Sequence, residues 1–173
     1  MEVTLDALLS SRDERWAMEK RLLREYPEAV VVVLTVVMPG SVKRDWRSLV
    51  VANAAVEAVN ELLGECALVS STRDLETGFE GYWVVRGDAV DVKRRLCAIE
   101  EAHPLGRLFD IDVLCGDAVP IPRTALGLAP RRCLLCANEA RWCMRNRSHA
   151  PEEVQAKITE MAAAYRKHGV DTK

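Results

Sequence analysis

The pattern of apolar and polar positions predicts helices and strands that follow one another along the chain. Residues 5–26 are rich in Glu, Arg and Leu and stop before Pro27, which predicts a helix that ends there. Residues 29–37 form a nearly continuous run of β-branched residues, which is typical of a buried strand. Between residues 45 and 63 the apolar positions recur at helical spacing, and Gly64 follows as a candidate helix C-cap.

The rest of the pattern completes an α+β order. Residues 66–72 and 79–86 predict two strands joined by a turn, residues 89–102 predict a helix, and residues 107–114 predict a further strand. From the first strand to the last the order is β-α-β-β-α-β, which is the split βαβ plan. We therefore predict one α+β domain with a ferredoxin-like or nucleotidyltransferase-like sheet, plus N-terminal and C-terminal helices, the latter over residues 151–168.

Composition and charge narrow the class of protein. The 173 residues suffice for one domain with a real core, so we treat 1–173 as a single domain. The net charge is -2, which does not suit a protein that coats nucleic acid. The longest apolar run, residues 29–38, is too short to span a bilayer, and the first residues lack the features of a signal peptide. We expect a cytoplasmic protein with no membrane or nucleic-acid partner.

Two carboxylates in the last predicted strand are the strongest sign of chemistry. Residues two apart in a strand point to the same face, so Asp110 and Asp112 project together while Phe109, Ile111 and Val113 face the core. Adjacent carboxylates repel each other unless a cation lies between them. Mg²⁺ holding a phosphate-bearing substrate is one interpretation, and a merely solvated strand end is the other.

Basic residues near this strand suggest an anion site. Six arginines and no lysine lie within residues 121–149, namely Arg123, Arg131, Arg132, Arg141, Arg145 and Arg147. Arginine matches phosphate oxygens with a bidentate fork, so a di- or triphosphate, an acidic protein or RNA are candidate ligands. The alternative is a solvated basic face, and the scarcity of aromatic residues beyond Trp142 disfavours RNA.

Four further residues are candidates for contacting a phosphate. Gly106 can let a phosphate approach the backbone, and Arg107 beside it offers a guanidinium. Lys43 and Lys93 are candidate point charges for the same ligand, although each is more often a surface lysine.

Three cysteines and a histidine within residues 121–150 have spacings typical of a structural zinc site: Cys133, Cys136, Cys143 and His149. The alternative is a set of reduced cysteines on one helix, because Cys136 and Cys143 are seven residues apart. The other three cysteines, at positions 66, 97 and 115, lie among apolar residues and are expected to be small core side chains.

Two long motifs make a family resemblance specific. The stretch from His103 to Val113, together with residues 127–136 and 143–149, resembles the citrate lyase holo-acyl-carrier-protein synthase family, also called apo-citrate lyase phosphoribosyl-dephospho-CoA transferases. The Arg-Asp-Glu-Arg stretch at residues 12–15 and the Pro-Gly-x-Val-Lys stretch at residues 39–43 are also similar to that family. The resemblance spans nearly the whole chain.

The resemblance implies a nucleotidyltransferase reaction. The donor is 2′-(5″-triphosphoribosyl)-3′-dephospho-CoA, the acceptor is a serine of the apo acyl carrier protein (γ) subunit of citrate lyase, and diphosphate is released. For this reaction we expect Asp110 and Asp112 to hold Mg²⁺, and we expect a third carboxylate from a neighbouring strand, which is not assigned. We expect Arg107, with some of Arg123, Arg131 and Arg132, to neutralise the diphosphate, and Lys43 and Lys93 are weaker candidates for the same role.

Two alternatives remain open at this stage. One keeps the chemistry but acts on the carrier subunit of malonate decarboxylase. The other is a non-enzymatic zinc-binding interaction module. For the citrate lyase reaction, the arginine segment also has two interpretations, because it can bind phosphate or dock an acidic carrier protein.

Overall fold

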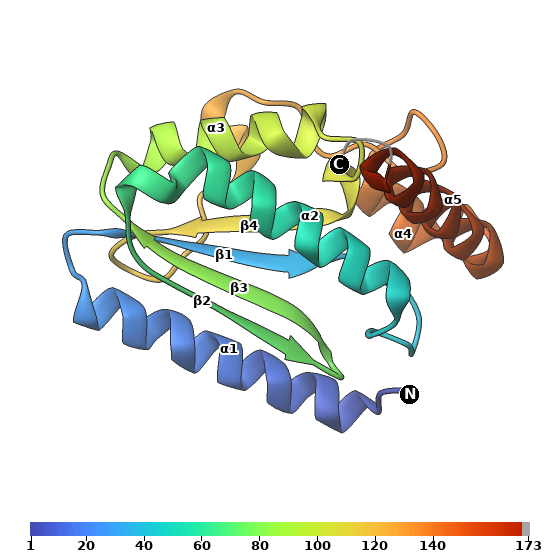
Figure 1. Ribbon diagram of the computed structural model, residues 1–173, viewed down its shortest axis with the longest axis horizontal. Helices are drawn as coiled ribbons and strands as arrows, with labels where there is room; N and C mark the ends of the chain where they lie inside the picture. The colour runs from blue at the N-terminus through green and yellow to red at the C-terminus, as the bar shows by residue number, and fades with distance from the viewer. Residues whose placement is uncertain (171–173) are drawn as a thin grey trace.

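Four antiparallel strands form one sheet in the order β2-β3-β1-β4 (Figure 1). Their bounds are β1 Val30–Val36, β2 Ala67–Leu75, β3 Gly78–Val85 and β4 Phe109–Leu114. The computed structural model describes residues 1–170. The strand order, with a helix after β1 and another after β3, is that of a ferredoxin-like sheet, so the predicted α+β class and topology are confirmed.

Helices α2 (Trp46–Leu63) and α3 (Ala89–Ala102) cover one face of the sheet. The larger core lies between them and this face, and includes the fully buried Leu34, Leu96 and Ile111. Each helix begins at an aspartate whose side chain accepts backbone N–H groups of the first turn, Asp45 for α2 and Asp88 for α3. The pattern in β1 is apolar on both sides because the opposite face of the sheet is also covered.

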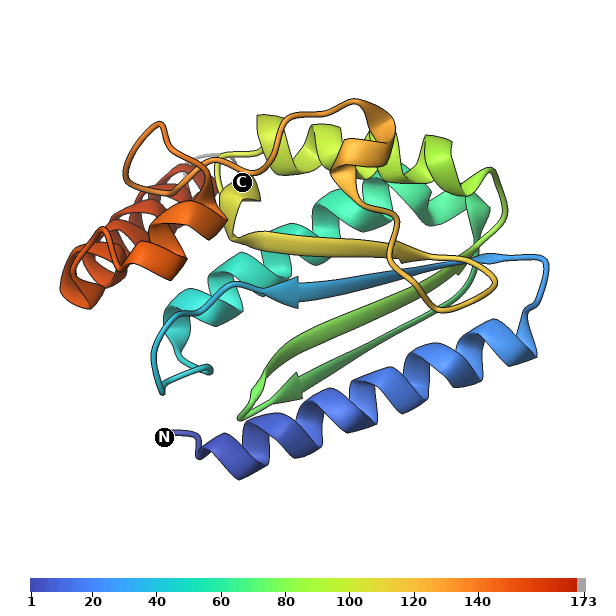
Figure 2. The ribbon, with the colours of Figure 1, turned by 180° about the vertical axis from the view of Figure 1, so that it is seen from behind.

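Helix α1 (Leu5–Glu25) lies along that opposite face (Figure 2). Only its C-terminal half packs into a core, where Leu22 and Leu23 meet Val31, Val33 and Tyr82 among others. The N-terminal half carries charged side chains such as Arg12 and Arg15 instead. The part of the sheet that faces this half of α1 can therefore carry polar and charged side chains.

The C-terminal part of the chain adds two short elements and one long helix. These are the 3-10 turn η3 (Arg123–Leu126), the short helix α4 (Ala140–Asn146) and the helix α5 (Pro151–Val170). Ile158 of α5 is fully buried, and Arg47 of α2 donates to the Gln155 side chain over 2.7 Å, so α5 packs on the domain. In residues 1–170 no helix combines the length and the apolar character that a bilayer crossing requires.

The structure differs from the sequence predictions at three places. Arg107 lies in a 3-10 turn, η2 (Gly106–Leu108), and not in the strand, because the amide of Leu108 bonds back to the Leu105 carbonyl. Another 3-10 turn, η1 (Gly64–Cys66), precedes β2. Cys97 is buried as expected, but the expectation of a core position is wrong for Cys66 and Cys115, which are exposed.

Candidate active site and metal cluster

Asp110 and Asp112 project together from β4 onto the α1 side of the sheet. Phe109, Ile111 and Val113 alternate with them and are buried on the α2 and α3 side. The two aspartate side chains are about half exposed, at 51% and 50%. Burial and the neighbouring Asp110 raise the pKa of Asp112, while Lys93, Arg15 and Arg131 act in the opposite direction. This face of the sheet therefore carries two solvent-accessible carboxylates, and a cation bound near them would offset their mutual repulsion.

Side chains close the open edge of β4. Lys93 and Glu100, both buried on α3, bond the backbone of Ile111, because the Lys93 ammonium donates to its carbonyl over 2.6 Å and a Glu100 oxygen accepts from its N–H over 3.1 Å. Arg131 donates to the Phe109 carbonyl, and its other terminal nitrogen lies 2.9 Å from the Asp110 carboxylate. Side chains therefore bond the Phe109 carbonyl and both backbone groups of Ile111 at a strand edge that would otherwise be open beside the aspartates.

Four of the predicted arginines surround one hollow of about 320 Å³ next to this edge. Its charged lining residues are Arg107, Arg123, Arg131, Arg132, Glu100 and Glu101. Arg123 forms ion pairs with both glutamates, and its guanidinium nitrogen lies 2.9 Å from a carboxylate oxygen of Glu100. Burial and the neighbouring Arg131 lower the pKa of the Arg107 guanidinium, which remains protonated at neutral pH. Since positive groups exceed negative ones, the hollow suits an anion.

The other residues that the sequence suggested as phosphate contacts do not line this hollow. Lys43 donates to the Met38 carbonyl over 2.6 Å, and burial together with Arg12 lowers its pKa. Gly106 is buried, and a Cβ atom there would lie 2.5 Å from the Glu100 carbonyl oxygen, so packing against α3 accounts for the glycine. Arg141, Arg145 and Arg147, on α4 and just after it, are exposed and do not line the hollow.

Several charged residues on the α1 side of the sheet were missed by sequence reasoning. Glu80 of β3 is 1% exposed, and the Tyr82 hydroxyl donates to it over 2.6 Å. Arg15 of α1 and Arg73 of β2 lie 3.5 and 3.7 Å from its carboxylate. The available signal was a glutamate within an apolar strand, together with the Arg-Asp-Glu-Arg stretch of α1 that had no assigned role.

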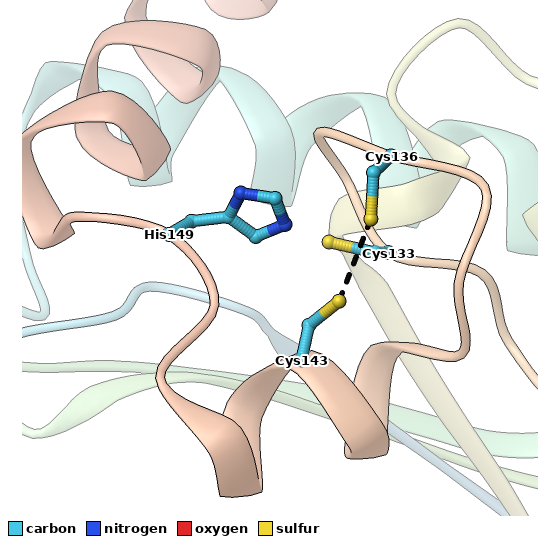
Figure 3. Close-up of side chains that lie close together, drawn as sticks. All are labelled: Cys133, Cys136, Cys143 and His149. Carbon is cyan, nitrogen blue, oxygen red and sulfur yellow. Dashed lines mark hydrogen bonds between the residues drawn. The ribbon is translucent and has the colours of Figure 1, made fainter.

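The cysteine and histidine side chains predicted to bind metal converge at one point. The ligand atoms of Cys133, Cys136, Cys143 and His149 all lie within 4.8 Å of one another. Figure 3 shows the three sulfur atoms and the imidazole ring turned toward a common centre. Cys133 and Cys136 come from the loop before α4, and Cys143 from α4 itself. The alternative of cysteines on one helix is therefore wrong, because Cys136 precedes the helix.

The chemistry of this donor set fits a metal ion. His149 Nε2 is buried and has no hydrogen-bond partner among the described residues, and Cys136 and Cys143 have their sulfurs 3.5 Å apart. Burial alone would raise the pKa of Cys133, but N–H groups of Leu135 and Cys136 and the two neighbouring thiols lower it to about 7. Burial and the other thiols raise the pKa of Cys143 to about 11. Such a cluster could bind a metal through thiolates and an imidazole.

Fold and site together define a class: a ferredoxin-like α+β protein with an aspartate pair on its last strand, an arginine-lined hollow beside that strand and a Cys3His cluster. The model of the family described as apo-citrate lyase phosphoribosyl-dephospho-CoA transferase matches residues 3–165. The chain belongs to this family.

Individual relatives agree with the family match. A protein of Streptococcus pyogenes serotype M18 named probable apo-citrate lyase phosphoribosyl-dephospho-CoA transferase is 34% identical over 167 residues, covering 94% of this chain and 87% of that protein. A protein with the same name from Vibrio cholerae serotype O1 (strain M66-2) is 36% identical over 169 residues, covering 95% and 94%. The protein named CitXG of Haemophilus influenzae is 34% identical over 164 residues, which are 93% of this chain but 35% of that protein.

Proposed function

We propose that this protein is a nucleotidyltransferase. It moves the phosphoribosyl-dephospho-CoA prosthetic group from triphosphoribosyl-dephospho-CoA to a serine of the apo acyl carrier (γ) subunit of citrate lyase and releases diphosphate. The names of the relatives support a transferase for apo-citrate lyase. The observation that carries the proposal is the position of Asp110 and Asp112, which share one sheet face immediately beside an arginine-lined hollow.

The aspartate pair fits a magnesium ion shared with the substrate. Mg²⁺ is usually bound through one or two carboxylates while substrate phosphates and waters complete the octahedron. Asp110 and Asp112 offer two carboxylates that are each about half exposed. When bound, Mg²⁺ would neutralise charge on the phosphate oxygens.

The surrounding residues position the phosphates and offset their charge. The serine oxygen forms a bond to the α-phosphorus as the bond to diphosphate breaks, and the serine proton passes to a carboxylate of the aspartate pair. Charge then grows on the diphosphate, and fixed guanidinium groups stabilise it. Arg107 and Arg132 are the better candidates, because Arg123 and Arg131 already bond acidic or backbone groups. Lys43 and Lys93 both donate to backbone carbonyls and are secondary candidates.

We assign zinc to the Cys3His cluster, in a structural role. All four coordination positions would be filled by protein atoms, which is typical of structural sites. Cys133 follows directly after Arg131 and Arg132, and Cys136 lies three residues further on. A filled cluster therefore fixes the chain that carries two arginines of the hollow.

A mass measurement tests the proposed reaction. The protein is incubated with apo carrier subunit, triphosphoribosyl-dephospho-CoA and Mg²⁺, and the carrier is weighed by intact-mass spectrometry. A gain equal to the donor minus diphosphate, lost when EDTA is added, is expected. If the folded protein modifies only the carrier subunit of malonate decarboxylase, that subunit is the acceptor. If it modifies neither carrier, the result favours the non-enzymatic zinc-binding module.

Asp110→Asn is expected to lower transfer by about 100-fold or more, because the variant loses a carboxylate that holds charge at the reacting phosphate. Because the Asp110 side chain is half exposed, the variant is expected to keep the melting temperature of the wild type. Asp117→Asn is the matched control, since Asp117 is exposed in the loop after the same strand. Wild-type turnover by Asp110→Asn would remove the assigned role.

A further inference from the structure

A buried carboxylate on β3 is not used by the reaction as proposed. Glu80 is 1% exposed, and one of its oxygens accepts from the Tyr82 hydroxyl over 2.6 Å. The other oxygen, Oε1, has no hydrogen-bond partner among the described residues. A carboxylate buried in this way is costly unless nearby positive charge compensates it.

Two arginines supply that charge from different elements. Arg73 of β2 lies 3.7 Å from Glu80 and also donates to Glu14 over 2.7 Å. Arg15 of α1 lies 3.5 Å from Glu80 Oε1, and within residues 1–170 its guanidinium makes no hydrogen bond that would occupy its donors. An arginine present only to neutralise Glu80 would be expected to form a bidentate pair with it. The donors of Arg15 are instead available to another acceptor.

The position of Arg15 puts those donors near the aspartate pair. In the sheet register Thr35 of β1 pairs with Glu80 on one side and with Asp110 on the other, and Val33 pairs with Tyr82 and with Asp112. Glu80 and the two aspartates thus project from one sheet face, across three neighbouring strands. Helix α1 runs along this face (Figure 1), and the Arg15 side chain, 28% exposed, reaches down onto it.

We propose that Arg15 binds the triphosphate of the donor above the aspartate pair, and that Glu80 is a positioning residue that holds Arg15 there. This inference rests on the proposed function and extends it. The arginine-lined hollow lies at the edge of β4, whereas Arg15 approaches from the α1 side, so the phosphate chain is held from two directions. A guanidinium with no hydrogen bond on its donors in the described part of the chain, beside a pair of carboxylates proposed to hold Mg²⁺, is suited to phosphate oxygens.

Calorimetry with magnesium pyrophosphate tests the role of Arg15. Arg15→Ala is expected to weaken binding at least tenfold. Arg15→Lys keeps the positive charge but lacks the bidentate donors of a guanidinium, so its affinity is expected to lie between those of the wild type and Arg15→Ala. Arg24→Ala is the control, because Arg24 is an exposed arginine in the last turn of the same helix. Absence of binding by the wild type, or wild-type affinity in both Arg15 variants, overturns the proposal.

Kinetics of Glu80→Gln test the positioning role. Glutamine can still accept from Tyr82 but cannot attract Arg15, so the KM for the donor is expected to rise several-fold while the KM for the carrier stays unchanged. A purely structural role would lower the melting temperature and leave the donor KM at its wild-type value, which overturns the positioning role. If Glu80→Gln does not fold, the Arg15 variants test the proposal, because Arg15 is partly exposed.

The two proposals fail in different ways. If the wild type binds pyrophosphate through Arg15 but modifies no carrier subunit, the phosphate site stands and the transfer reaction fails. If the carrier is modified but pyrophosphate binding does not depend on Arg15, the reaction stands and the inference is overturned.

Discussion

Lys93 and Glu100 are each 4% exposed, and both hydrogen-bond the backbone of one residue, Ile111. From the sequence Lys93 is a surface lysine or a phosphate contact, because periodicity does not reveal which strand a helix lies against. The bond that explains it joins residues 18 positions apart. The alternation around Asp110 and Asp112, by contrast, follows from strand geometry alone and could be predicted.

Gly106→Ala is expected to destabilise the fold by about 1–3 kcal/mol, because overpacking against rigid backbone carries a cost of that order. A Cβ atom at this position would lie 2.5 Å from the Glu100 carbonyl oxygen and 2.7 Å from that of Ile99. Chemical denaturation measures the change. A variant of unchanged stability with a raised KM for the donor would instead support the interpretation that a phosphate approaches the Gly106 backbone.

His103 is expected to make the stability of the fold depend on pH. Burial lowers its pKa below the ordinary value near 6.5, with partial opposition from Glu57. Its Nδ1 accepts from the Leu105 N–H over 3.0 Å, which requires a neutral nitrogen. Between the lowered pKa and about 6.5 the unfolded chain binds a proton that the folded chain does not, so stability falls as the pH decreases through this window.

The variant His103→Asn isolates this effect. An asparagine oxygen can accept from the N–H two residues on, so the turn is retained without the titration. Urea unfolding at pH 7.5 and 5.5 is expected to show a larger loss of stability in the wild type than in the variant. Equal losses would contradict the assignment of the pH dependence to His103.

At the level of elements, the segment between β4 and α5 has little regular structure of its own. It contains the turn η3 and the seven-residue helix α4 within residues 115–150. Its hydrogen bonds to the earlier part of the chain pass through Arg123, Arg131 and the amide of Ile121. A cross-link within the segment is a physical reason for it to hold one conformation, and a metal bound by the Cys3His cluster would provide one.

Metal removal is expected to loosen this segment and spare the sheet. Metal analysis should find one zinc per chain, absent in Cys143→Ser and kept in Cys115→Ser, whose thiol lies outside the cluster. Chelation should speed tryptic cleavage after Arg131, Arg132 and Arg141 while the far-ultraviolet circular dichroism is largely retained. Unchanged cleavage, or a wild-type protein that takes up no zinc, would contradict the structural role.

At the scale of the whole molecule, the β-α-β-β-α-β order was enough to predict the sheet, because few topologies connect such a series of elements. The placement of α1 was not predictable in the same way. Its apolar residues that pack into a core, Leu22 and Leu23, are confined to one end, so the sequence does not say which sheet face it covers. Glu80 and Arg15 were missed for this reason, since their proximity depends on that placement.

The filled edge of β4 has a consequence for self-association. An unpaired strand edge is a template on which a second molecule can add a strand, and here Lys93, Glu100 and Arg131 occupy the positions such a strand would need. The same side chains flank the aspartates, so replacing one of them changes both the charge at the site and the tendency to aggregate. An inactive Lys93 variant that elutes as the wild type does reports on the reaction, whereas one that elutes as larger species reports on the exposed strand.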